Sequence, residues 1–177
     1  PKDIKALAQT SKGFGYETKI LNAVELVNLE QKKIVSNKVI KRFGEDLSSF
    51  TFAVWGLSFK PETNDMRESS AITVINELTS RGAKIKAYDP KAMYESQYHY
   101  LENNTNVEYF DNKYDVLNNS DAMILLTEWK EFRSPDFEEL KIRLNNNIIF
   151  DGRNIYDKVK LKELNFEYFQ IGVNNDV

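Results

Sequence analysis

Cysteine is absent from the chain of 177 residues, and histidine occurs only once. Without a thiol the chain can form no disulfide and carries no thiolate nucleophile, so nothing indicates an oxidising compartment. We therefore expect a cytoplasmic location. One histidine and no cysteine also leave too few nitrogen and sulfur ligands for a zinc or other transition-metal site, and no metal centre is expected.

Long apolar runs and blocks of like charge are absent as well. No run approaches the roughly 20 apolar residues that span a bilayer, and the first residues lack the apolar region of a signal peptide. The 24 Lys and Arg residues are scattered among 27 Asp and Glu residues, for a net charge of -3. This pattern gives no electrostatic footprint for nucleic acid or an anionic membrane, and it favours a small or anionic ligand.

Glycine and proline are missing from residues 21–42, where apolar residues recur at spacings of three, four and seven. This period predicts one long amphipathic helix, with Gly44 placed for a left-handed C-terminal cap. Such a helix rises roughly 33 Å, which is long for a connector in a small domain. We expect it to join two domains or to pair with its copy in a dimer.

From Phe50 onward, short apolar runs alternate with helical segments. The alternation predicts an α/β fold with a doubly wound, mostly parallel sheet, whose ligand binds beyond the carboxyl ends of the strands. We divide the chain into residues 1–44 and a domain at 45–177. The predicted strands are 50–56, 84–88, 106–110, 122–127, 147–150 and 166–173, and the predicted helices are 70–81, 135–144 and 158–164, with a helical turn at 113–119.

The loop after the first predicted strand holds the first candidate site. Gly56 is its only glycine, so the loop lacks the Gly-x-Gly-x-x-Gly fingerprint that cradles a dinucleotide pyrophosphate. It offers Lys60 and Arg67 before a helix N-terminus, which suits a phosphate recognised by side chains. Position alone equally allows two solvated charges paired with Asp65 and Glu68.

Arg153 follows another predicted strand and is therefore expected at the same edge of the sheet. Gly152 lets the backbone approach a ligand closely, and a guanidinium can hold a phosphate bidentately. The same side chain can equally pair with Asp151.

For two further polar residues, Asp89 and His99, we favour a role outside the binding site. Asp89 ends a strand where dinucleotide-binding folds place a ribose-binding acid, but it lies 33 residues after Gly56, beyond the usual spacing of about 20. A turn with Pro90 is the better interpretation. His99 lies between two tyrosines with no Ser or Asp motif nearby, so a surface histidine is favoured over a general base.

Four segments, in order and spacing, resemble the UDP-glucose 6-dehydrogenase family, and together they cover nearly the whole chain. Residues 65–69 and 127–132 look more like the UDP-glucose enzymes than like their GDP-mannose or UDP-N-acetylmannosamine relatives. The four segments are Pro1-Lys2-Asp3 followed by an Ala-Leu step, the loop from Gly56 to Ser70, residues 126–132 (Leu-Thr-Glu-Trp-Lys-Glu-Phe) and residues 150–154 (Phe-Asp-Gly-Arg-Asn).

The resemblance implies an oxidoreductase that uses two NAD to convert UDP-glucose to UDP-glucuronate, in two hydride transfers through a cysteine thioester. In that family an N-terminal Rossmann domain binds NAD, a central helix forms the dimer, and a C-terminal Rossmann-like domain binds UDP. The cysteine belongs two residues before the Pro-Lys-Asp motif. We therefore expect a C-terminal portion that is inactive alone and lacks both the nucleophile and the NAD-binding domain.

The resemblance also implies roles for single residues. Asp3 matches an aspartate that assists the water or the alcohol proton, and Lys2 matches a residue that lines the active site and the cofactor. Arg67 matches a residue that reaches NAD. Three positions match substrate contacts: Phe59, Lys60 and Arg153.

Three alternatives remain open beside a UDP-glucose dehydrogenase that serves polysaccharide biosynthesis. The chain could be a free-standing module that senses a UDP-sugar, or an assembly module that forms a homodimer through residues 21–43. It could also come from a GDP-mannose or UDP-N-acetylmannosamine dehydrogenase. UDP-glucose and a second copy of the chain are the expected partners, with no nucleic acid and no membrane.

Overall fold

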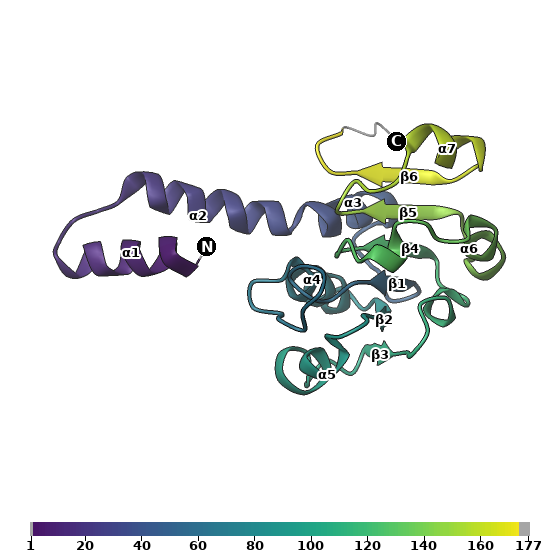
Figure 1. The fold of residues 1–177 in the computed structure, drawn as a ribbon, viewed down its shortest axis with the longest axis horizontal. Helices are drawn as coiled ribbons and strands as arrows, with labels where there is room; N and C mark the ends of the chain where they lie inside the picture. The colour runs from purple at the N-terminus through teal and green to yellow at the C-terminus, as the bar shows by residue number, and fades with distance from the viewer. Residues whose placement is uncertain (1, 174–177) are drawn as a thin grey trace.

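The structure, a computed structural model, describes residues 2–173. Its centre is one sheet of six parallel strands in the order β3-β2-β1-β4-β5-β6 (Figure 1). The order reverses between β1 and β4, which is the switch point where such sheets bind ligands. The predicted doubly wound fold is confirmed, and the sheet is parallel throughout. The strands are β1 (Thr51–Trp55), β2 (Lys84–Tyr88), β3 (Val107–Tyr109), β4 (Ala122–Leu125), β5 (Ile148–Asp151) and β6 (Glu167–Gln170).

Helices cover both faces of the sheet because its central strands are apolar on both sides. Every residue of β4 and β5 is buried, as expected for strands inside a parallel sheet. One face packs against α3 (Ile34–Phe43) and α4 (Ser70–Ser80), whose Val39 and Val74 are fully buried. The other face packs against α6 (Phe137–Arg143) and α7 (Lys158–Glu163). Short helical segments lie at Met93–Glu95 (α5), Ser96–Tyr100 (η1), Asp115–Leu117 (η2) and Lys130–Phe132 (η3).

The prediction of one unbroken helix over residues 21–42 is wrong. The segment forms α2 (Lys19–Lys32) and α3, interrupted at Lys33. There the Lys33 N–H donates to Glu30 O three residues back, and the buried Ser36 hydroxyl donates to Lys33 O. Both bonds tighten the turn. The second helix ends before Gly44, whose φ of 97° with ψ of 177° is positive but not left-handed helical.

An arm formed by α1 (Lys2–Gly13) and α2 extends from the sheet, with α1 running back along α2 (Figure 1). We did not predict α1, whose sequence is largely polar. None of the described side chains of α1 or α2 is buried, whereas α3 packs into the core of the sheet. The division of the chain at residue 44 stays a prediction, and α3 lies before it. Within residues 2–173, no helix combines the length and the apolarity that crossing a membrane requires.

Candidate ligand-binding site

A cavity of about 380 Å³ lies between the arm and the carboxyl edge of the sheet. One wall comes from α1 and α2, including Lys5 and Lys32. The opposite wall comes from the loops that follow β1, β4 and β5, including Phe59 and Arg153. The cavity therefore lies at the switch point where the fold is expected to bind its ligand.

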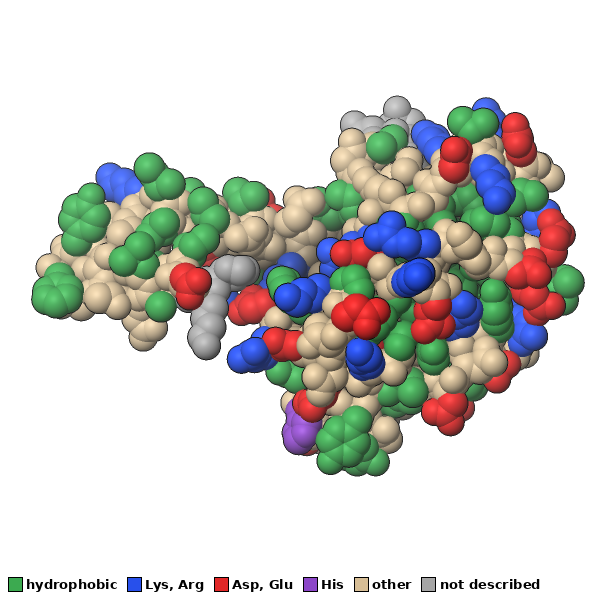
Figure 2. Space-filling model, viewed as in Figure 1, with side chains coloured by type: hydrophobic (Ala, Val, Ile, Leu, Met, Phe, Trp, Pro, Cys, Tyr) green, Lys and Arg blue, Asp and Glu red, His purple; other side chains and the backbone are tan. Residues whose placement is uncertain are grey.

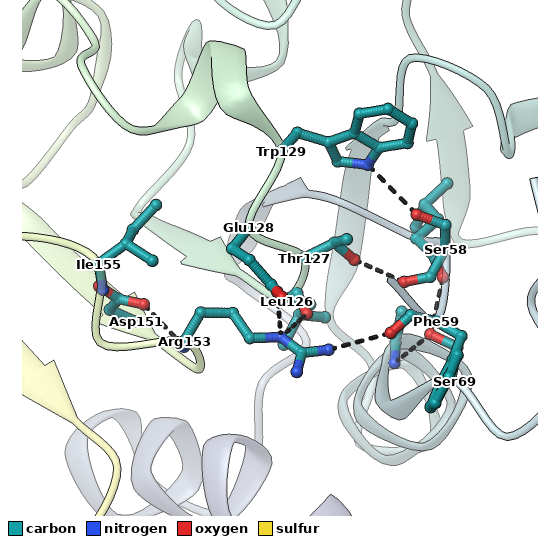
Figure 3. Close-up of polar contacts among 12 residues, drawn as sticks. Ser58, Phe59, Ser69, Leu126, Thr127, Glu128, Trp129, Asp151, Arg153 and Ile155 are labelled. Carbon is teal, nitrogen blue, oxygen red and sulfur yellow. Dashed lines mark hydrogen bonds and ion pairs between the residues drawn. The ribbon is translucent and has the colours of Figure 1, made fainter. Parts of the chain in front are cut away.

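Close packing between the β1 and β4 loops shapes the sheet side of the cavity. Gly56 has a φ of 91°, and a Cβ added there would lie 2.6 Å from both Cβ and N of Thr127. Only glycine permits this approach without strain. The Thr127 hydroxyl then donates to Ser58 O at 2.6 Å, which ties the two loops together (Figure 3).

The Asp89 side chain anchors the loop that follows β1. Its Oδ2 accepts from the backbone N–H of Leu57 (2.7 Å) and of Ser58 (3.1 Å), and from the Trp129 indole N–H (3.1 Å). Its Oδ1 accepts from the N–H groups of Lys91 and Ala92, which forms the turn around Pro90. The side chain is 1% exposed. This carboxylate is therefore part of the scaffold and is not directed at a ribose.

Arg153 lines the cavity from the β5 side. Its Nε–H donates to Leu126 O at 2.7 Å, and Nη2 lies 3.4 Å from Phe59 O (Figure 3). Glu128 Oε2, which is buried and accepts no hydrogen bond among the described residues, forms an ion pair with Nε at 3.1 Å. The guanidinium is thus oriented by neighbours, while within residues 2–173 its Nη1 has no hydrogen-bond partner.

Asp151 does not pair with the Arg153 guanidinium. Its Oδ1 accepts the Arg153 backbone N–H at 2.8 Å, and its Oδ2 accepts the N–H groups of Ile155 and Tyr156 and the Tyr168 hydroxyl. Like Asp89, this buried acid organises the loop that follows its own strand. The alternative in which the Arg153 side chain pairs with Asp151 is therefore wrong: the guanidinium pairs with Glu128 instead.

Lys60 and Arg67 lie on the β1 loop, but neither lines the cavity. Lys60 is exposed. Arg67 is 71% exposed and donates from Nε and Nη2 to Asp65, and these hydrogen bonds lower the pKa of the Asp65 carboxyl to about 2. The solvated pair that we considered for Arg67 is therefore present, whereas Glu68 has other partners.

Glu68 accepts from two lysines of the arm. Lys5 Nζ of α1 lies 2.8 Å from its Oε1, and Lys32 Nζ of α2 lies 2.5 Å from its Oε2. Lys32 and Lys5 lower the pKa of the Glu68 carboxyl to about 2. Sequence reasoning missed this cluster, because nothing in the sequence indicates that positions 5, 32 and 68 meet in space.

The start of α1 reaches the cavity. Ile4 and Lys5 line it, while the neighbouring Asp3 is exposed and is not among the lining residues. The side chain of Lys2 lies outside what the structure describes. Lys2 and Asp3, for which catalytic roles are predicted, thus immediately precede two lining residues in the sequence. Their roles stay predictions.

The carboxyl end of β1 does not fit a dinucleotide pyrophosphate. A dinucleotide-binding fold brings a glycine backbone against the pyrophosphate at this point, but here Thr127 packs against Gly56. Across residues 2–173, no group of three or more His, Cys, Asp or Glu side chains is arranged to hold a metal ion.

Comparison with known proteins decides the family. The model of the UDP-glucose/GDP-mannose dehydrogenase family, UDP binding domain, matches residues 53–158, which include the three loops at the sheet edge. The chain belongs to this family. The resemblance drawn from the four sequence segments is confirmed, and the matched residues form the UDP binding domain of the family.

The similar proteins are much longer than this chain. The UDP-glucose 6-dehydrogenase of Pseudomonas aeruginosa is 34% identical over 174 residues, which cover 97% of this chain and 38% of that protein. The UDP-glucose 6-dehydrogenase of Rhizobium meliloti is 36% identical over 172 residues, with the same two shares. A UDP-glucose dehydrogenase structure from Pyrobaculum islandicum aligns with a TM-score of 0.78 at 28% identity, covering 96% of this chain and 36% of that one. The chain thus spans about 38% of the length of these curated relatives.

Proposed function

We propose that the cavity at the sheet edge binds a UDP-sugar, with Arg153 as the principal contact for its phosphates. The supporting observation is the position of this guanidinium, which is fixed by Leu126 and Glu128 and lines the cavity at the switch point of the fold. A guanidinium that is already oriented loses little conformational entropy when it binds a phosphate. Phe59 lines the same wall, and Lys60 extends the positive charge along the adjoining loop.

We further propose that the chain is the substrate-binding portion of an NAD-dependent UDP-glucose 6-dehydrogenase in the cytoplasm. Support comes from the names of the relatives, which are UDP-glucose 6-dehydrogenases. The complete reaction would convert UDP-glucose to UDP-glucuronate through a cysteine thioester, and the product would supply polysaccharide synthesis. The thiol has no counterpart in this chain, so the chain alone is expected to be inactive.

Within that reaction the proposed roles of this chain are binding and orientation. Asp3 would assist the water or the alcohol proton, because it lies next to Ile4 and Lys5 at the arm side of the cavity. Lys2 would line the active site, and Arg67 would reach the cofactor from the exposed side of the β1 loop. The apolar lining residues, such as Leu29 and Leu126, would exclude water from the sugar.

Arg153→Ala is expected to weaken UDP binding by about 1–3 kcal/mol, the cost of losing charge-assisted hydrogen bonds to phosphate. Calorimetric titration with UDP would measure the change as a roughly 5- to 150-fold increase in Kd. Arg133→Ala is the matched control, because Arg133 is an exposed arginine that does not line the cavity. Equal affinities in the parent and in Arg153→Ala would exclude this residue from the site.

The arm has the surface of an assembly element, and we propose that a second copy of the chain covers it. Hydrophobic side chains gather along the arm (Figure 2). Ile20, Val24 and Val27 follow a helical spacing on α2 and are 79%, 37% and 59% exposed. Glu25 lies on another side of the helix, where it pairs with Lys5 of α1. The exposed stripe is therefore free to meet a partner helix.

A dimer is the expected state, and Val27→Asp is expected to convert it to a monomer because a charge would be buried without a partner. Light scattering would then report a fall from twice 20.6 kDa to 20.6 kDa. Asn22→Asp adds the same charge on a different side of α2 and is expected to leave the dimer intact. A monomeric parent chain would contradict this proposal.

A further inference from the structure

Glu68 has a backbone conformation that is unusual for a residue other than glycine. Its φ is 62°, in the left-handed region that non-glycine residues rarely adopt. The neighbouring residues hold it there: the Ser69 N–H donates to Met66 O, the Ser69 hydroxyl donates to Leu57 O at 2.7 Å, and Met66 is 1% exposed. Strain of this kind persists where the surroundings impose it, and it often accompanies function.

The strained turn directs the Glu68 carboxylate at the arm. Its two oxygens accept from Lys5 of α1 and from Lys32 of α2, so one acid joins two helices to the β1 loop. Lys5 also approaches Glu25 at 3.7 Å, but that contact lies within the arm. Among the described residues, the bond to Glu68 is thus the polar contact that connects α1 with the sheet domain.

Packing alone does not fix the arm. No described side chain of α1 or α2 is buried, whereas the loops on the opposite wall of the cavity are anchored by Asp89 and Thr127. Glu68, Lys5 and Lys32 all line the cavity, so the ion pairs that join the two walls lie within it. Several partly shielded charges that share one carboxylate stabilise a geometry better than one exposed pair does.

We propose that Glu68 is a positioning residue that holds the α1–α2 arm against the sheet edge and so sets the distance between the two walls of the UDP-sugar cavity. The value of this distance for binding rests on the proposed function. Release of the acid would separate the walls, expose the ligand to water and move the start of α1, including Asp3, away from the loops that carry Phe59 and Arg153.

Glu68→Gln tests this role, because it keeps the shape of the side chain and removes its charge. The matched control is Glu62→Gln: Glu62 lies on the same loop with a φ of 65°, pairs with Lys91 at 3.3 Å, and does not line the cavity. In the 177-residue chain, we expect Glu68→Gln to raise the Kd for UDP about tenfold and to accelerate amide hydrogen exchange in α1, with β1 and β4 unchanged. Glu62→Gln should match the parent in both measurements.

A second variant separates backbone strain from the ion pairs. Glu68→Gly suits the positive φ, so its sheet domain should unfold at a midpoint no lower than that of the parent, yet it should lose UDP affinity and α1 protection as Glu68→Gln does. Parent-like hydrogen exchange in α1 of both variants would overturn the positioning role. Because exchange is measured without ligand, that outcome is distinct from failure of the parent to bind UDP, which would contradict the proposed function instead.

Discussion

Gly56→Ala is expected to destabilise the chain by about 3–5 kcal/mol, one of the two largest effects that we predict for a single substitution. Two costs add at this position. An alanine at a φ of 91° is strained, and its Cβ would lie 2.6 Å from the backbone N and the Cβ of Thr127. Thr127 cannot retreat freely, because it is fully buried and its hydroxyl is bound to Ser58 O. Equilibrium unfolding in urea, followed by tryptophan fluorescence, measures the change.

Gly44→Ala is the matched control for this substitution. Gly44 has a similar φ of 97°, but a Cβ there would meet no atom within 4 Å. Only the backbone strain applies, and we expect a loss of about 1–3 kcal/mol. The difference between the two variants isolates the overlap with Thr127. If the two losses were equal, close packing between the β1 and β4 loops would not be what requires glycine at position 56.

Asp89→Ala is expected to cost about 3–5 kcal/mol and to abolish UDP binding. Removing the carboxylate leaves the buried Leu57 and Ser58 N–H groups without their acceptor. The Trp129 indole N–H would keep only the Ser58 hydroxyl, at 3.2 Å. The β1 loop, which carries Phe59, would lose its anchor. Urea unfolding and calorimetric titration with UDP together measure both effects.

Asp157→Ala provides the comparison for Asp89→Ala. Asp157 is exposed and accepts from the N–H groups of Val159 and Lys160 at the start of α7. Its removal is expected to cost about 1 kcal/mol, the usual value of an N-cap, and to leave UDP binding unchanged. Similar losses in the two variants would mean that Asp89 contributes only its local turn around Pro90 and not the support of the β1 loop.

The sheet could be predicted because its strands are short apolar runs that a parallel sheet buries on both faces. The run at β4, Ala122–Leu125, is an example in which every residue is buried. The interruption at Lys33 could not be predicted from a segment without glycine or proline, because it accompanies a side-chain bond from Ser36. The helix at α1 was missed although Ile4, Leu7 and Ala8 follow a helical spacing, because the rest of its sequence is polar and the apolar stripe is short.

At the site, the sequence could predict where a residue lies in the fold but not which side chains it pairs with. Arg153 could be placed at the ligand edge because it follows a strand of a parallel sheet, and it does line the cavity. The partners of Glu68 could not be foreseen, since Lys5 and Lys32 lie 63 and 36 residues away in the sequence. The extent of the role of Asp89 was missed for the same reason, because its bond to Trp129 joins two loops.

Titration of the chain with UDP, UDP-glucose, GDP and NAD, each in a separate calorimetric experiment at one salt concentration, tests the central claim most directly. We predict that UDP and UDP-glucose bind, since both present the diphosphate and uridine that the domain is proposed to recognise. GDP and NAD should give no binding heat, the latter because Thr127 closes the space at Gly56 that a dinucleotide pyrophosphate would use. Absence of UDP binding, or equal binding of GDP, would contradict the assignment of this cavity as a UDP-sugar site.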